Sequence, residues 1–267
     1  MPTPALSARI SGLGVLGPGL ADWRSAAAML AGQTAYHPAP TTLPAVHALP
    51  AAERRRTGTT VRLALAVGQQ AVRDADADAA TLATVFASSG GDGATCHEIC
   101  TTLASEDRQL SPTRFHNSVH NAAAGYWGIA LNATARSTAL CAFDGSFAAG
   151  LLEAMTQVAV EGAPVLLVAY ETAYPEPLHA KRPLPDAFGV ALLLDPRPGG
   201  PAHARITLSL AEGAAERMPQ PLLEALRVSA PAARSLPLLR RLARRDEGPV
   251  RLEYLGRCLQ VEVCECH

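Results

Sequence analysis

The sequence lacks an excess of charge of either sign. Its 267 residues include 23 Lys and Arg against 24 Asp and Glu, which gives a formal net charge of -1. Without a basic surplus to neutralise phosphates, binding to nucleic acid is not expected. A chain of this length can bury a large core in one body. We therefore expect a single domain over residues 1–267.

Long apolar runs are also missing. No stretch approaches the roughly 20 apolar residues that a membrane-spanning helix needs. The N-terminal residues show neither the basic start nor the long apolar stretch of a secretory signal. These absences predict a cytoplasmic protein without a membrane span.

Cysteine is sparse, with six residues scattered over the chain. This pattern, without a secretory signal, predicts free thiols rather than a disulfide framework. Cys96 and Cys100 are spaced four residues apart on a predicted helix, which is typical of two small residues on one packed face.

The C-terminal string Cys264-Glu265-Cys266-His267 has the composition of a metal-ligand cluster. It lacks a second pair of ligands, and apolar residues alternate over 259–263, which predicts a strand there. We therefore expect no metal site.

Apolar runs alternate with helical patterns along most of the chain, which predicts an α/β fold with a mixed central sheet. Gly12, Gly14 and Gly17 are expected to form tight turns at the end of the first strand. The expected strands cover residues 5–16, 82–87, 137–141, 164–170, 189–194 and 205–210. The expected helices cover residues 21–30, 61–75, 94–104, 121–131, 145–157 and much of 211–247, and two last β segments turn at Gly256.

The segment 88–93, Ser-Ser-Gly-Gly-Asp-Gly, joins a predicted strand to a predicted helix in the manner of a phosphate-binding loop. It lacks both the Gly-x-Gly-x-x-Gly spacing and a Gly-Lys-Ser/Thr ending. No nucleotide or other cofactor is therefore expected.

Three strings, residues 121–125, 138–146 and 182–194, together resemble segments of one enzyme family, the β-ketoacyl synthases. Residues 121–125, Asn-Ala-Ala-Ala-Gly, resemble the family's Asn-x-Ala-Ala-Gly. Residues 138–146, Thr-Ala-Leu-Cys-Ala-Phe-Asp-Gly-Ser, resemble its nucleophile turn, Thr-Ala-Cys-Ala-x-Gly. Residues 182–194 resemble a shortened Arg-Pro-Phe-Asp and Asp-Gly-Phe segment. The resemblance covers about residues 5–200 and implies the N-terminal half of a thiolase-like fold, completed by a divergent C-terminal extension over residues 205–267.

The nucleophile turn departs from the family's pattern. When Gly145 is superposed on the family's glycine, Ala142 takes the position of the catalytic cysteine and Cys141 falls one residue early. A one-residue shift directs the sulfur away from the helix N-terminus that would favour a thiolate. Asp144 would further disfavour a thiolate beside it. We interpret Cys141, Ala142, Phe143, Asp144 and Gly145 as a pseudo-active site.

Active members of the family also use two C-terminal histidines to stabilise the charge that develops in decarboxylation. Only His267 follows His203 here, and neither lies in the family's Gly-Thr-x-Thr or Gly-His context. The resemblance therefore implies a catalytically silent relative, similar to the chain-length factors that pair with a ketosynthase and shape its acyl pocket. Residues 137–154 most resemble a short subgroup associated with aryl polyene and related lipid or polyketide assembly.

The resemblance implies a β-ketoacyl-acyl-carrier-protein synthase as heterodimeric partner. Half of a pseudo-symmetric fold leaves an apolar face that either residues 205–267 or another chain must cover. An acyl carrier protein is a second candidate partner, with Arg240, Arg241, Arg244 and Arg245 as a basic patch that could instead be a solvated helix face. We assign to the partner interface the residues Phe115, His116, Asn117, Ser118, His120 and Asn121. Some of these could instead satisfy backbone groups of a buried loop.

Two other hypotheses remain open on the sequence alone. One is a thiol acyltransferase or condensing enzyme that uses Cys141, with His116 or His120 as base. The other is a stand-alone protein that binds acyl carriers. Under the silent-partner hypothesis, Phe143 blocks the position where a substrate channel would continue from the partner. Tyr126 and Trp127 are expected in the core.

Overall fold

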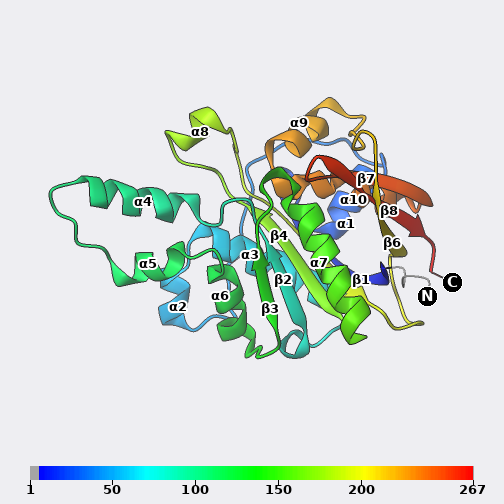
Figure 1. Ribbon diagram of the computed structural model, residues 1–267, viewed down its shortest axis with the longest axis horizontal. Helices are drawn as coiled ribbons and strands as arrows, with labels where there is room; N and C mark the ends of the chain where they lie inside the picture. The colour runs from blue at the N-terminus through cyan, green and yellow to red at the C-terminus, as the bar shows by residue number, and fades with distance from the viewer. Residues whose placement is uncertain (1–5, 267) are drawn as a thin grey trace.

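The computed structural model describes residues 6–266 and contains one eight-stranded sheet (Figure 1). The strands are β1 (Leu6–Leu16), β2 (Ala83–Ala87), β3 (Ser137–Leu140), β4 (Val165–Glu171), β5 (Phe188–Asp195), β6 (Ala204–Ala211), β7 (Gly248–Tyr254) and β8 (Arg257–Cys264). Their order is β3-β2-β4-β5-β1-β6-β8-β7. The β3-β2-β4 pairs are parallel and the remaining pairs antiparallel, which confirms the predicted mixed sheet.

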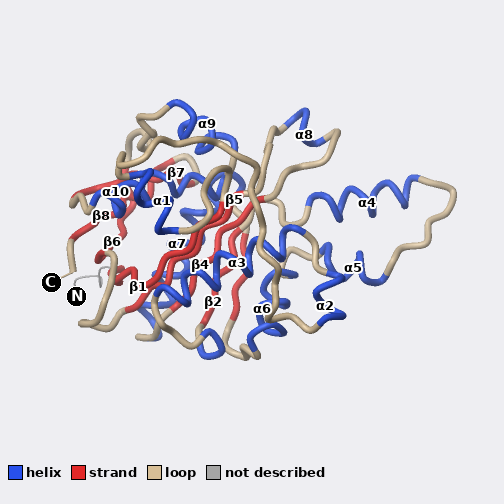
Figure 2. The backbone as a smooth tube through the Cα atoms, turned by 180° about the vertical axis from the view of Figure 1, so that it is seen from behind, coloured by secondary structure: helices blue, strands red, loops and turns tan. Residues whose placement is uncertain are grey.

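Helices cover both faces of this sheet, so the fold has three layers (Figures 1 and 2). The α-helices are α1 (Trp23–Leu30), α2 (Ala51–Arg56), α3 (Thr59–Asp74), α4 (Gly93–Ala104), α5 (Pro112–Ser118), α6 (Ala122–Leu131), α7 (Ser146–Glu161), α8 (Leu178–Lys181), α9 (Pro221–Ser229) and α10 (Leu236–Arg244). Three short 3-10 helices are η1 (Ala79–Thr81), η2 (Phe143–Gly145) and η3 (Pro231–Ser235). One apolar cluster packs α3 and α6 on one face, and a second packs α1, α7, η3 and α10 on the other. No helix within residues 6–266 is both long and apolar enough to cross a membrane.

The C-terminal region forms its own part of the second layer. Helix α10 buries Leu236, Leu238 and Leu239 in the same cluster as residues of η3 and of α7. The β7-β8 hairpin turns at Gly256, whose φ of +79° is a conformation that glycine adopts readily, as the sequence predicted. The prediction of helix over much of 211–247 is wrong for residues 212–220, which form no helix. Prolines at the starts of α9 and η3 divide the helical part of this region into separate helices.

Gly12 and Gly14 do not form turns, which corrects the prediction made for them. Both lie inside β1, where α3 crosses the strand closely. A Cβ on Gly12 would lie 2.1 Å from Ala71 O, and one on Gly14 would lie 2.2 Å from Val67 O. Here glycine permits the backbones of a strand and a helix to approach each other.

Helix α4 corrects a second prediction. Cys96 and Cys100 are exposed, and α4 buries none of its residues. The reason is that α4 and α5 project together away from the sheet as an arm, visible in both views (Figures 1 and 2). Contacts that hold this arm together include the ion pair of Arg114 Nε with Glu98 Oε2 (3.1 Å).

Candidate functional site

The turn after β3 has a strained backbone. Cys141 and Ala142 leave the strand, η2 follows, and α7 begins at Ser146. Phe143 has a φ of +50°, in the left-handed region that side chains other than glycine rarely adopt. Ser146 Oγ accepts a hydrogen bond from Ala142 N (3.0 Å) and donates one to Phe143 O (2.7 Å). These two bonds hold the turn in its strained conformation.

Phe143 is the large side chain that this turn presents to solvent. It is 63% exposed, Cys141 before it is also exposed, and Ala142 between them is half-buried. A nucleophile at a strand-to-helix turn sits on such a strained residue, because the sharp turn exposes its side chain beside the helix N-terminus. Superposing the glycines assigns that position to Ala142, and the residue with positive φ lies one position later, at Phe143.

A chain of alternating charges surrounds the turn. Arg182 Nη2 donates to Asp144 Oδ1 (2.5 Å), and Arg234 Nη2 donates to Asp144 Oδ2 (3.0 Å). Arg234 also forms an ion pair with Glu253 on β7. The guanidinium carbon of Arg182 lies 3.8 Å from the centroid of the Phe143 ring, which is cation–π geometry. No spacing in the sequence predicts these contacts, although the motif that resembles the nucleophile turn includes Asp144.

A buried carboxyl lies at the end of β4. Glu171 is almost fully buried, and Ser89 donates to it through both its backbone N–H (2.6 Å) and its hydroxyl (2.9 Å). Tyr174 shares a further hydrogen bond with the Ser89 hydroxyl (3.0 Å). Burial raises the pKa of Glu171 to about 7, although the Ser89 hydrogen bonds and the charge of Arg182 act in the opposite direction. Sequence reasoning missed Glu171; its only signal is a carboxylate that directly follows an apolar run.

The glycine-rich segment 88–93 hydrogen-bonds to itself. Ser88 Oγ accepts from Gly91 N (3.0 Å), and Asp92 Oδ1 accepts from Thr95 N (2.9 Å) at the start of α4. With these groups already paired inside the loop, the geometry does not favour phosphate binding.

The residues assigned to the partner interface fall into two groups. Asn117 Nδ2 donates to Arg56 O (2.7 Å), and its Oδ1 accepts from Tyr126 (3.0 Å). His120 Nε2 donates to Ser88 O (2.9 Å). These side chains satisfy backbone and core groups. Phe115, His116 and Asn121 are exposed, whereas Ser118 is half-buried and donates from its hydroxyl to Phe115 O (2.8 Å).

Tyr126 and Trp127 are buried, as predicted. The His116 ring packs edge-on against Tyr126, with 6.0 Å between centroids. Within residues 6–266, no hydrogen bond joins Cys141 to either histidine of the segment, so the structure does not assemble the thiol with a base.

Helices α4, α5 and α6 lie on the side of the sheet that ends in β3, and α4 and α5 project well beyond it (Figure 1). Large apolar side chains occur on these helices and on the loop after α5. Four of these large side chains are exposed: Leu103, Phe115, Val119 and Ile129. β3 is the edge strand of the sheet, so the backbone groups on its outer side pair with no other strand of residues 6–266.

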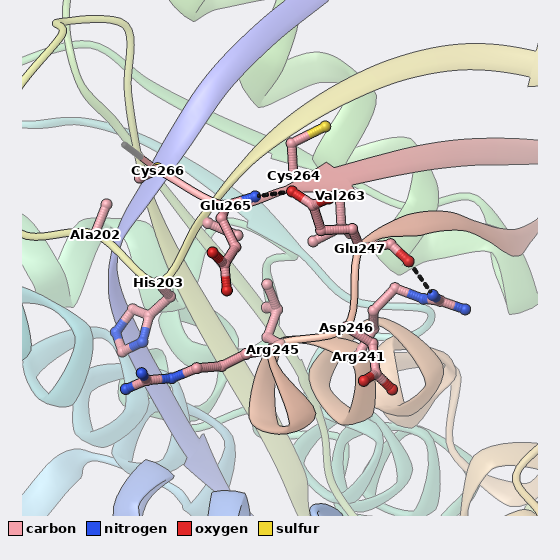
Figure 3. Close-up of a pocket in the computed structure, with 12 residues that line it drawn as sticks. Ala202, His203, Arg241, Arg245, Asp246, Glu247, Val263, Cys264, Glu265 and Cys266 are labelled. Carbon is pink, nitrogen blue, oxygen red and sulfur yellow. Dashed lines mark hydrogen bonds between the residues drawn. The ribbon is translucent and has the colours of Figure 1, made fainter.

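Cys264 is the last residue of β8, and Cys266 lies two residues beyond it (Figure 3). They line a pocket of about 280 Å³ that also contains His203, Arg241 and Arg245. His267 lies outside the described residues. Within residues 6–266, no group of three metal-ligating side chains is arranged to hold an ion.

Comparison with known proteins identifies the family of this chain. A family model described as β-ketoacyl synthase, N-terminal domain, matches residues 23–247. No curated protein matches the sequence.

Several solved structures share the fold. One is a ketosynthase (ApeO) in complex with its chain length factor (ApeC) from Xenorhabdus doucetiae, with a TM-score of 0.71, 24% identity, and coverage of 96% of this chain and 99% of the matched chain. The ishigamide ketosynthase/chain length factor matches with a TM-score of 0.70 and 14% identity, over 96% and 98% of the two chains. AntDE:AntF, a type II polyketide synthase acyl-carrier protein in complex with its ketosynthase, gives a TM-score of 0.76 and 10% identity, over 97% and 99%.

Proposed function

We propose that this chain, which belongs to the β-ketoacyl synthase N-terminal domain family, is a non-catalytic partner of a β-ketoacyl-acyl-carrier-protein synthase, similar in role to a chain length factor. The observation that carries the proposal is Phe143 on the strained residue of the turn. A phenyl ring cannot attack a thioester, so the position that would hold a nucleophile is chemically inert. Structures of the same fold include complexes of ketosynthases with their chain length factors, which supports the role by analogy.

Cys141 is poorly situated to replace the missing nucleophile. It follows the last residue of β3 and precedes the turn, five residues before α7 begins at Ser146. The described residues provide no hydrogen-bonded base for it, since His120 is bonded to Ser88 O. A cysteine activated for acyl transfer needs such a base or a helix N-terminus.

The β3 edge and the neighbouring apolar side chains are the proposed contact surface for the ketosynthase. An unpaired strand edge can accept a strand from a second chain, and clustered apolar side chains gain free energy when they are buried. The exposed members Phe115, Val119 and Ile129 lie on α5, the loop after it and α6, and α6 packs against both α5 and β3. In the proposed complex, the arm formed by α4 and α5 reaches over the partner.

The proposal also assigns roles to the C-terminal region and to the turn. We propose that residues 205–267 complete the domain by covering the face on which η3 and α10 pack. Phe143 then forms an end wall of the ketosynthase's acyl pocket. We propose products of the polyketide or fatty-acid type, including aryl polyenes, with an acyl carrier protein as the source of substrate.

Co-expression with the ketosynthase encoded nearest to this chain tests the proposal. Size-exclusion chromatography with light scattering should give a 1:1 heterodimer for the natural chain. Phe115→Asp should abolish the heterodimer, because burying a carboxylate in the contact surface is costly when no opposite charge pairs with it. The matched control is Leu222→Asp on α9, since the two side chains are 61% and 51% exposed. Equal heterodimer yield for both variants would reject this surface, and no heterodimer with the natural chain would reject the partner role.

A further inference from the structure

We propose that Arg182 is a positioning residue that fixes the ring of Phe143 and thereby sets where the partner's acyl pocket ends. The inference rests on the proposed function and adds a specificity-determining residue to it. Arg182 lies on the segment after α8, 39 residues from Phe143 along the chain, and reaches the turn only through the fold.

Phe143 has limited packing to define its orientation. It is 63% exposed, so the core of this chain contacts only a minor part of the side chain. The guanidinium carbon of Arg182, 3.8 Å from the ring centroid, covers one face of the ring. A stacked cation of this kind favours one ring orientation over the others. An end wall with one orientation gives a sharper limit to chain length than a ring that rotates.

Arg182 is itself held firmly. Its Nη2 donates to Asp144 Oδ1 (2.5 Å), and its backbone N–H donates to Leu178 O (2.9 Å). Asp144 is in turn bound by Arg234, which is nine-tenths buried and pairs with Glu253. The two arginines are matched by two carboxylates. This balanced set of charges is therefore a brace for the turn rather than an empty site for an anion.

The planar guanidinium is essential to this arrangement. It can stack on an aromatic ring and donate within its plane to a carboxylate at the same time. A lysine ammonium at the same position could pair with Asp144 but has no plane to lay over Phe143. Arg182→Lys therefore separates the charge of Arg182 from its stacking.

The test compares product lengths made by the purified heterodimer with malonyl and acyl carrier substrates, measured by mass spectrometry. Phe143→Ala should lengthen the products. Arg182→Gln and Arg182→Lys should broaden the distribution toward longer products, with heterodimer yield within about twofold of the natural chain. The double variant Phe143→Ala/Arg182→Gln should match Phe143→Ala alone. The control Arg257→Gln, which breaks an exposed ion pair with Glu212, should change nothing.

Several outcomes would overturn the inference. One is an unchanged product distribution in the Arg182 variants while Phe143→Ala changes it. Another is a double variant that differs from Phe143→Ala, because Arg182 would then act independently of the ring. If Arg182→Gln does not fold, Arg182→Lys carries the comparison. An active heterodimer whose products are unaffected by Phe143→Ala would refute the end wall and this inference with it, whereas a natural chain that forms no heterodimer would refute the proposed function itself.

Discussion

Ser89 donates two hydrogen bonds to Glu171, one from its backbone N–H at 2.6 Å and one from its hydroxyl at 2.9 Å. These bonds do not fully offset the loss of water around the buried carboxyl, whose pKa is raised to about 7. The unfolded chain therefore releases this proton near pH 4.5, and the folded chain retains it until about pH 7. Within that window the folded state binds more protons, so stability falls as the pH rises.

The first prediction follows from this fall in stability with rising pH. The contribution of Glu171 to the free energy of unfolding should decrease by about 3 kcal/mol between pH 4.5 and pH 8. Glu171→Gln should remove most of that decrease, which urea denaturation at several pH values would measure. Glu161→Gln, at an exposed glutamate of α7, serves as control and should keep the natural slope. A Glu171→Gln protein with an unchanged slope would contradict the assignment.

A second prediction concerns the crossing of β1 and α3. Gly12→Ala should lower the free energy of unfolding by about 1–3 kcal/mol or more, because its Cβ would lie 2.1 Å from Ala71 O and the two backbones must move apart. Gly125→Ala on α6 is the matched control, since nothing lies within 4 Å of its Cβ position. That control should be neutral or stabilising by up to about 1 kcal/mol. Equal effects of the two substitutions on thermal unfolding would show that the crossing is not tight.

The strained turn supports a third prediction. Phe143→Ala and Phe143→Gly both remove the ring, but only glycine adopts a φ of +50° without steric cost. The glycine variant should be more stable than the alanine variant by about 1 kcal/mol, the usual cost of a left-handed residue with a side chain. Denaturant unfolding of the isolated chain measures this difference. An alanine variant at least as stable as the glycine variant would mean that the turn stores no strain.

The ion-pair chain yields a fourth prediction. Asp144→Asn should lower the free energy of unfolding by about 1–3 kcal/mol, because it leaves Arg182 and the buried Arg234 without their shared carboxylate. Glu253→Gln should cost less than about 1 kcal/mol, since the Glu253 side chain is 44% exposed. If the two variants are equally stable, Asp144 contributes no more to the stability of this ion-pair network than Glu253 does.

Much of the sheet could be predicted from local pattern alone. The buried strands β4 and β5 are continuous apolar runs, and the β7-β8 turn has a glycine where a left-handed residue is needed. Local pattern also led to a wrong prediction, that one face of α4 is buried. The spacing of Cys96 and Cys100 defines a helix face but not what that face meets, and α4 has no sheet beneath it.

The candidate site was predictable only in part. Motif spacing located the turn between β3 and α7 and assigned the nucleophile position to Ala142. It did not reveal that the strained residue is Phe143, because backbone strain depends on the fold around the turn. Nor could spacing reveal the brace, since Asp144 lies 38 residues from Arg182 and 90 from Arg234. Such contacts follow no periodic pattern in the sequence.

The most direct test of the central claim, that the chain is catalytically silent within a ketosynthase complex, is a malonyl-condensation assay on the co-purified heterodimer. The natural chain is compared with Cys141→Ala, at equal amounts of complex. The account predicts equal condensation rates, with the ketosynthase alone inactive or much slower. A condensation rate that collapses in Cys141→Ala, with the heterodimer intact, would contradict it and identify Cys141 as a nucleophile.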